Sequence, residues 1–180
     1  MSRILLCAGA SVAIYKACDL ASKLAQSGHE VRVALTPAAA QLVAPQLFEA
    51  VTGAPAGSTE FGPERRGAMD HIDLAQWAEL VVVAPCTADL AGRIANGLGD
   101  DLVTTALLAL PGPIPRLLVP AMNPNMLEQP AVARNLARLR EDGWEVVEPE
   151  AGHMACGVEG RGRFADPALI AARIADLLAG

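Results

Sequence analysis

Five short apolar segments, separated by helical patterns, constrain the fold of this 180-residue chain more than any other feature. They read ILLCA, VALT, VVVAP, LLVPAMN and VVEP, and they are rich in Val and Leu. Strands that are apolar on both faces are typical of a parallel sheet covered by helices on both sides. The alternation therefore predicts strands and helices in turn along the whole chain.

The stretches between these segments predict helices with recognisable ends. Gly28 follows an apolar helical stripe and acts as a stop signal. Asp166 and Pro167 predict the N-cap and the first turn of a C-terminal helix. Residues 53–70, rich in Gly, Pro and charge, predict a loop, and WEVVEP predicts a last strand. We predict one domain over residues 1–180, with an α/β fold built on a three-layer, doubly wound, mainly parallel sheet of the flavodoxin/Rossmann-like type.

Composition argues against several classes of protein. Hydrophobic residues make up 52% and charged residues 19%, which is unlike a disordered chain. The net charge of −6 argues against a nucleic-acid-binding protein, and no apolar run is long enough for a membrane span. We interpret the apolar N-terminal run as a first strand and not as a signal peptide. We therefore expect a cytoplasmic protein that binds neither nucleic acid nor membrane.

The four cysteines are Cys7, Cys18, Cys86 and Cys156. Their spacing fits neither a zinc site nor a small disulfide scaffold, and reduced thiols are the expectation for a cytoplasmic chain. We interpret the first three as packing residues, and we expect no metal site.

Polar residues follow the predicted strands, at the edge where open α/β sheets bind ligands. Gly9 and Ser11 form a small-residue turn that either receives a phosphate on its N–H groups or simply starts a helix. Thr36 ends the second strand. Thr87 and Asp89 follow the third, where they either cap the next helix or bind ligand hydroxyls.

Asn123 and His71 are the other polar candidates. Asn123 precedes Pro124, so it is either an ordinary N-cap or a neutral amide that holds a carboxylate as that group leaves as CO2. His71, flanked by Asp70 and Asp73, is either a surface residue at a helix start or a general acid–base near neutral pH.

The stretch AGHMACGVEGRGR, residues 151–163, combines glycines, basic side chains and a thiol. Its glycines let the chain fold closely over a ligand and move, so we expect a mobile flap. Arg161 and Arg163 suit an anionic ligand such as a phosphate. Nearby cations favour the thiolate of Cys156, which makes it a candidate acid or nucleophile. His153 is either a helper or a structural residue.

Three stretches together resemble the homo-oligomeric flavin-containing cysteine decarboxylases: HIDLAQWAELVVVAPCTADLAGRIANGLGDDL, PAMNPNM and GHMACGVEGRGR. The resemblance covers nearly the whole chain, and the second and third stretches together are specific. It implies FMN-dependent decarboxylation of 4′-phosphopantothenoylcysteine to 4′-phosphopantetheine in coenzyme A synthesis. In that reaction FMN oxidises the cysteine moiety to a thioaldehyde, CO2 leaves to give an enethiol, and reduced flavin returns the hydride.

The resemblance also implies roles for individual residues. His71 would be the active-site base, Asn123 would bind the departing carboxylate, and Cys156 would donate a proton in the reductive half. Contacts with FMN are implied for Gly9, Ser11, Thr36, Thr87, Asp89 and Met122. We assign contacts with the substrate to Met126, Ala155, Gly157, Arg161 and Arg163.

The same resemblance implies the partners. The substrate would be a small phosphorylated molecule that contains cysteine, and the protein would assemble as a trimer or as a dodecamer of trimers. FMN would lie at the subunit interface, with His71 presented there. A phosphopantothenate–cysteine ligase, fused to the decarboxylase in many bacteria, would be a separate partner of this chain.

The sequence departs from the usual family pattern in places. Gly9 and Ala10 stand where Thr and Gly are usual, and Leu127 stands where Trp is usual. Asp89 replaces an asparagine, and a carboxylate near an FMN phosphate repels it unless Arg93 or another cation compensates. Two other classes remain open: a flavin prenyltransferase on a related scaffold, and a non-catalytic flavin-binding regulatory subunit.

Overall fold

The computed structural model describes residues 1–61, 69–153 and 157–180. Six parallel strands form one sheet in the order β3-β2-β1-β4-β5-β6, which is the strand order of the Rossmann fold. The strands are β1 (Arg3–Ala8), β2 (Glu30–Leu35), β3 (Ala56–Gly57), β4 (Leu80–Cys86), β5 (Arg116–Pro120) and β6 (Glu145–Val146). The predicted doubly wound α/β fold is confirmed.

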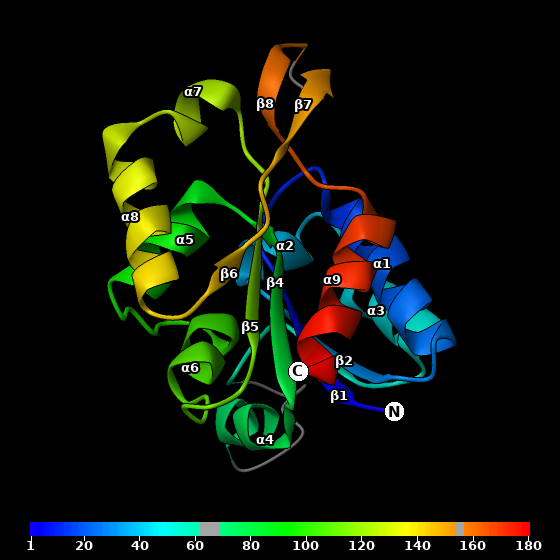
Figure 1. Cartoon of the computed structure of the whole chain (residues 1–180). Coiled ribbons are helices and arrows are strands. Elements are labelled where there is room, and N and C mark those ends of the chain that lie inside the picture. The colour runs from blue at the N-terminus through cyan, green and yellow to red at the C-terminus, as the bar shows by residue number, and fades with distance from the viewer. Residues whose placement is uncertain (62–68, 154–156) are drawn as a thin grey trace.

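Helices cover both faces of the sheet (Figure 1). One layer holds α1 (Ile14–Gln26), α3 (Pro45–Thr52) and α9 (Pro167–Ala179). The other holds α4 (Asp70–Trp77), α5 (Ala88–Ala95), α6 (Leu102–Leu108) and α8 (Pro130–Glu141). Two single-turn helices, α2 (Pro37–Ala40) and α7 (Pro124–Leu127), follow β2 and β5. Within the described parts of the chain, no helix is long and apolar enough to cross a membrane.

The central strands are buried on both faces, as their continuous apolar sequences predict. In β1, Ile4 and Leu6 pack into the core under α1, α3 and α9, whereas Leu5 and Cys7 pack into the core on the opposite face. Every residue of β4 is buried. Because successive side chains of a strand point to opposite faces, a strand of this kind needs a helical layer on each side.

The C-terminal helix begins where the sequence predicts. The Asp166 side chain caps α9 by accepting a hydrogen bond from the Ala168 N–H at 2.7 Å, and Pro167 occupies the first turn. Ile170 and Ile174 are buried against the sheet. The local cap and the apolar stripe are therefore enough to place this helix.

Two edge strands differ from the sequence prediction. The predicted loop over residues 53–70 contains β3, a two-residue edge strand that pairs with Val33 and Ala34 of β2. The predicted last strand shrinks to β6, which pairs with Leu117 and Leu118 of β5. Pro149 follows closely and has no N–H with which to continue a ladder.

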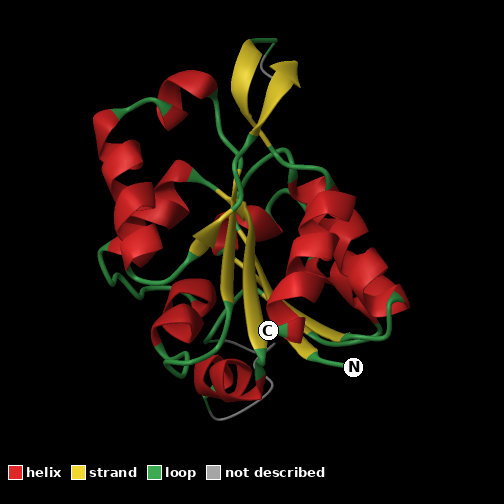
Figure 2. Ribbon diagram, in the orientation of Figure 1, coloured by secondary structure: helices red, strands yellow, loops and turns green. Residues whose placement is uncertain are grey.

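The glycine-rich stretch, predicted as a loop, forms an antiparallel hairpin of β7 (Glu150–His153) and β8 (Glu159–Arg163). The hairpin stands beyond the carboxyl ends of the parallel strands, at the same end of the molecule as α7 (Figure 2). The Met122 N–H donates a hydrogen bond to the Gly162 carbonyl at 3.0 Å. This bond joins the hairpin to the segment that follows β5.

Gly9 allows the ends of β1 and β4 to approach closely. Its N–H donates to the Pro85 carbonyl at 2.9 Å, and a Cβ added at Gly9 would lie 2.9 Å from the same oxygen. Such a Cβ would also lie 3.2 Å from the Leu90 side chain. A side chain at this position therefore forces backbone apart.

We predict that Gly9→Ala lowers the free energy of unfolding by about 1–3 kcal/mol, because it overpacks a backbone contact. Urea denaturation followed by tryptophan fluorescence measures this change. Gly112→Ala is the matched control, since a Cβ there would meet nothing within 4 Å. Equal stability of the two variants would contradict the prediction.

Candidate functional site

A cavity of about 620 Å³ opens at the carboxyl edge of the sheet, beyond β1, β2, β4 and β5. Of the residues predicted to contact FMN, it is lined by Ser11, Thr36, Thr87, Asp89 and Met122. Met126, predicted to contact substrate, lines it as well. The fold therefore brings together residues that are scattered over more than a hundred positions of the sequence.

Two hydroxyl residues of this first cavity, Thr36 and Thr87, also cap helices, and Ser11 accepts a bond in the turn before α1. Thr36 Oγ1 accepts from the Ala39 N–H at 3.1 Å, and Thr87 Oγ1 accepts from the Leu90 N–H at 3.2 Å. Ser11 Oγ accepts from the Ala13 N–H at 3.2 Å. Each of these bonds uses the oxygen as an acceptor and leaves the hydroxyl hydrogen to donate to a ligand. The capping and ligand-binding interpretations are therefore compatible.

The charges of the first cavity are mainly negative. Asp89 lines it together with Asp100 and Asp101, and Arg93 supplies a cation. Arg93 Nη1 lies 2.8 Å from Asp101 Oδ2, and Arg93 Nη2 pairs with Asp100. Two carboxylates thus already hold the guanidinium that could compensate Asp89. This arrangement favours hydroxyl groups of a ligand beside Asp89 over a phosphate.

A second cavity of about 380 Å³ shares Ser11, Ala121 and Met122 with the first. It is also lined by Asn123 and Arg163, both predicted as site residues. Asn123 Oδ1 accepts from the Asn125 N–H at 2.8 Å, so Asn123 is the predicted N-cap of α7 while it faces this cavity. The shared residues place the two cavities side by side.

Other predicted residues line neither cavity. Gly9 packs against β4, and Gly157 is exposed in the turn region of the hairpin. Arg161 is exposed, and its Nη2 lies 2.8 Å from Glu148 Oε2. Ala155 and Cys156 lie outside the described residues.

His71 lies near the start of α4, at the end of the molecule opposite the hairpin (Figure 1). Its Nδ1 contacts Glu60 Oε1, and both side chains are largely buried. A single chain therefore does not bring His71 to Asn123.

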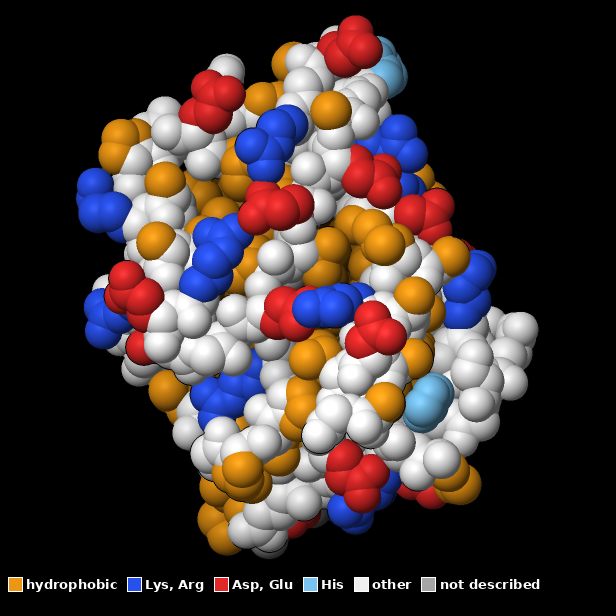
Figure 3. All heavy atoms as spheres, viewed as in Figure 1, with side chains coloured by type: hydrophobic (Ala, Val, Ile, Leu, Met, Phe, Trp, Pro, Cys, Tyr) orange, Lys and Arg blue, Asp and Glu red, His pale blue; other side chains and the backbone are white. Residues whose placement is uncertain are grey.

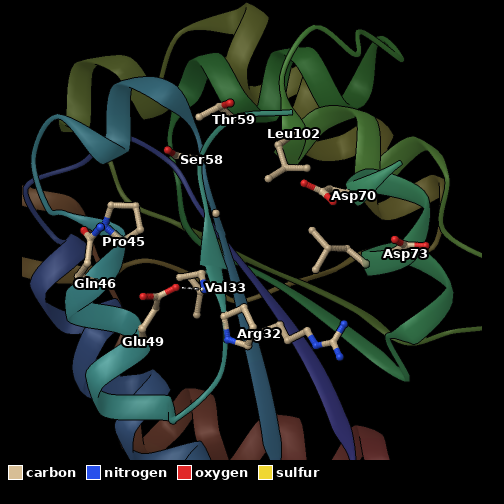
Figure 4. A pocket seen from close by; sticks show the side chains of 14 residues that line it. Arg32, Val33, Pro45, Gln46, Glu49, Ser58, Thr59, Asp70, Asp73 and Leu102 are labelled. Atoms are coloured by element: carbon tan, nitrogen blue, oxygen red, sulfur yellow. Dashed lines mark hydrogen bonds between the residues drawn. The ribbon is translucent and has the colours of Figure 1, made fainter. Parts of the chain in front are cut away.

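A third cavity, of about 450 Å³, lies between α3, β3 and α4 (Figure 4). Glu49, Asp70 and Asp73 line it together with Arg32, whose guanidinium carbon stacks 4.3 Å from the centre of the Trp77 ring. No sequence pattern predicts this cavity, because it depends on how the loop after α3 packs. It contains none of the residues predicted for the site.

Two basic residues of the second cavity were not selected from the sequence. Lys16 lines it from the first turn of α1, and His153, left open as helper or structural residue, lines it from the end of β7. In the sequence, a lysine near a helix start looks like a solvated surface residue. Its place in a cavity depends on residues from distant parts of the chain that form the other wall.

Comparison with known proteins gives a consistent result. The family described as Flavoprotein matches residues 1–179. The coenzyme A biosynthesis bifunctional protein CoaBC of Bacillus subtilis (strain 168) is 43% identical over 164 residues, which is 91% of this chain and 40% of that protein. CoaBC of Escherichia coli (strain K12) is 40% identical over 168 residues, or 93% of this chain and 41% of that protein. The chain thus spans about two fifths of the length of these curated relatives.

Solved structures of related proteins superimpose on nearly the whole chain. A cysteine-to-serine mutant of PPC decarboxylase complexed with pantothenoylaminoethenethiol superimposes with a TM-score of 0.84 and 29% identity, covering 99% of both chains. The FMN-dependent cysteine decarboxylase SpaF superimposes with a TM-score of 0.82 and 29% identity, covering 99% of this chain and 98% of that one.

Three cysteines are packed away from solvent, as predicted. Cys7 and Cys86 are completely buried, and Cys18 is nearly so. Burial raises the pKa of all three thiols because it penalises the thiolate, and the charge of Asp89 adds to the rise at Cys86. These thiols are poor nucleophiles in the folded protein.

We predict that Cys7 and Cys86 react with iodoacetamide about 100-fold or more slowly than a free thiol near pH 8, because reaction requires the chain to open. Peptide mass spectrometry after timed labelling measures each position. The control is the same protein in urea, where both thiols label rapidly. Rapid native labelling of Cys86 would show that the end of β4 is open to solvent.

Proposed function

Because the chain belongs to the Flavoprotein family, we propose that it binds FMN and decarboxylates 4′-phosphopantothenoylcysteine to 4′-phosphopantetheine. The observation that carries this proposal is the hydroxyl-lined first cavity beside Asn123 at the carboxyl edge. The CoaBC relatives are bifunctional, and this chain matches about two fifths of them. We assign the decarboxylase step of coenzyme A synthesis to residues 1–180, acting as one flavoprotein domain.

The first cavity suits FMN in size and chemistry. Its volume of about 620 Å³ lies within the range of small-molecule and cofactor sites. Ser11, Thr36 and Thr87 would donate hydroxyl hydrogens to the cofactor. Asp89 would accept from ribityl hydroxyls, and Met122 would contact the ring. When bound, FMN supplies a reversible acceptor for the two electrons of the substrate's thiol-bearing carbon.

Asn123 would hold the substrate carboxylate. Its N-cap bond to Asn125 fixes the side chain where it lines the second cavity. A neutral amide binds a carboxylate by hydrogen bonds without the strong charge stabilisation that a cation would give. The carboxylate therefore keeps less ground-state stabilisation to lose when it departs as CO2.

We propose that Cys156 donates the proton that completes the reaction. It follows β7 in the sequence by three residues, and β7 belongs to the hairpin that Gly162 joins to Met122. His153 and Arg163 of this hairpin line the second cavity, so a proton donor close to them in the sequence would meet the substrate at the same edge.

We propose that a second copy of the chain supplies His71 as the base. His71 lines neither of the cavities at the carboxyl edge, so a site that used His71 would take it from another subunit. A homotrimer, or a dodecamer of trimers, would provide that contact at each site. A separate phosphopantothenate–cysteine ligase would supply the substrate. We place the reaction in the cytoplasm, where free thiols such as those of Cys7 and Cys18 are kept reduced.

The direct test is a visible absorption spectrum of the purified protein together with mass spectrometry after incubation with 4′-phosphopantothenoylcysteine. We expect a yellow protein and a product lighter by CO2. A yellow protein that releases no CO2 would favour a regulatory flavin-binding subunit. Prenylated flavin formed from dimethylallyl phosphate would favour a prenyltransferase.

We predict that Asn123→Asp lowers the rate of CO2 release about 100-fold or more, equivalent to ~2.7 kcal/mol, because a second carboxylate repels the first. Asn125→Asp is the matched control, since that side chain is exposed two residues further on and should keep near-normal turnover. A turnover assay that detects CO2 measures both. Normal turnover by Asn123→Asp would refute the role of Asn123.

We predict that Cys156→Ser still releases CO2 but accumulates the oxidised, enethiol-type product, because serine is a much weaker acid than a thiol. Mass spectrometry distinguishes this product from 4′-phosphopantetheine by two hydrogens. Complete conversion to 4′-phosphopantetheine by the variant would remove the proton-donor role.

A further inference from the structure

The second cavity gathers basic side chains from three elements. Lys16 comes from α1, His153 from the end of β7 and Arg163 from the end of β8. Among the described residues, no carboxylate lines this cavity, whereas Asp89, Asp100 and Asp101 line the first one. Basic charge is therefore concentrated on one side of the shared wall. The chain as a whole has a net charge of −6.

This concentration is local. Figure 3 shows acidic and basic side chains interspersed over the face that it displays, without a large patch of one sign. A cluster of cations in a cavity then acts on a ligand through contact and not through a long-range field. The cavity thus selects an anionic group that enters it.

The hairpin glycines make room for Arg163. A Cβ added at Gly152 would lie 3.1 Å from Arg163 Nη1. The arginine side chain therefore passes over a residue that has no side chain to obstruct it. Gly162 has a φ of +140°, and a Cβ there would lie 2.1 Å from the Met122 carbonyl oxygen. The two glycines let β8 rest against the segment after β5 while Arg163 lies along β7.

Arg163 keeps donors for a ligand. Its Nε forms a loose ion pair with Glu150 Oε2 at 3.7 Å, which is beyond hydrogen-bond distance, so its N–H groups can still donate to a ligand. Arg161, by contrast, lies 2.8 Å from Glu148 on the exposed side. Of the two arginines of the stretch, Arg163 is the one that lines the cavity.

The two lysines of the chain, Lys16 and Lys23, differ in whether a carboxylate holds them. Lys23 lies two turns further along α1, and its ammonium pairs with Asp19. Lys16 forms no ion pair within the described parts of the chain, and its side chain lines the cavity that Arg163 enters. An ammonium and a guanidinium facing one cavity suit a phosphate monoester, which carries up to two negative charges.

We propose that Lys16 and Arg163, with His153 as a further donor, bind the phosphate end of the substrate in the second cavity. This inference rests on the proposed function for the identity of the substrate. Asn123 lines the same cavity and would take the cysteine carboxylate, so the two ends of one molecule would be held apart. Val12, Tyr15 and Phe164 also line this cavity, and their apolar surfaces suit the aliphatic part of the substrate between its phosphate and its carboxylate.

The test is calorimetric titration of the flavin-loaded protein with 4′-phosphopantothenate and with pantothenate. These probes share the substrate's arm, differ by the phosphate and have no cysteine to decarboxylate. We expect Lys16→Gln and Arg163→Gln each to weaken binding of the phosphorylated probe about tenfold or more, with little effect on pantothenate. Lys23→Gln is the matched control and should change neither affinity.

Three further readouts keep the result interpretable. Lys16→Arg should restore most of the affinity, because the charge returns. Flavin content should be unchanged, and its loss in Lys16→Gln would reassign the cations to the cofactor phosphate and overturn the inference. Equal weakening of both probes, or an unchanged preference for the phosphorylated probe, would overturn it as well. Failure of the wild-type protein to release CO2 would refute the proposed function alone, since the affinities are measured without turnover.

Discussion

The burial of β1, β4 and β5 on both faces is the constraint on which the rest of the structure depends. Leu5 and Leu6 are adjacent in the chain and fully buried, yet they belong to cores on opposite sides of the sheet. Each return from one strand to the next must therefore cross a face as a helix, which makes the strands parallel. Parallel strands end at one edge, and both cavities of the site open there.

At that edge the molecule separates its charges. The first cavity contains three carboxylates and an arginine held by two of them, whereas the second contains cations. The wall between them includes Met122, which also carries the backbone bond to Gly162 of the hairpin. The same contact therefore closes the second cavity and positions Arg163. In this arrangement the substrate's phosphate would meet cations, and the ribityl hydroxyls of a flavin would meet carboxylates.

The sequence was sufficient for features that depend on local patterns. It predicted the central strands, the Asp166 cap and the meeting of Ser11, Thr36 and Thr87 at one edge, because strand periodicity and parallel topology determine them. It was insufficient for β3 and β6, where two residues pair along an edge without a distinctive pattern. It also missed the β7–β8 hairpin and the position of Lys16 in the second cavity, because both depend on residues distant in the chain. Gly162, one of the glycines predicted to give mobility, has a packing role, since it leaves room for the Met122 carbonyl.

The hydroxyl caps have a consequence for binding energetics. Thr36 and Thr87 are oriented by the helices they cap before any ligand arrives. The rotamer entropy of these side chains is thus lost during folding, and association with a cofactor does not have to pay for it again. Such preorganisation ties affinity to the integrity of two short helices. Evolutionary drift at either threonine would thus be restrained twice, by the fold and by the ligand.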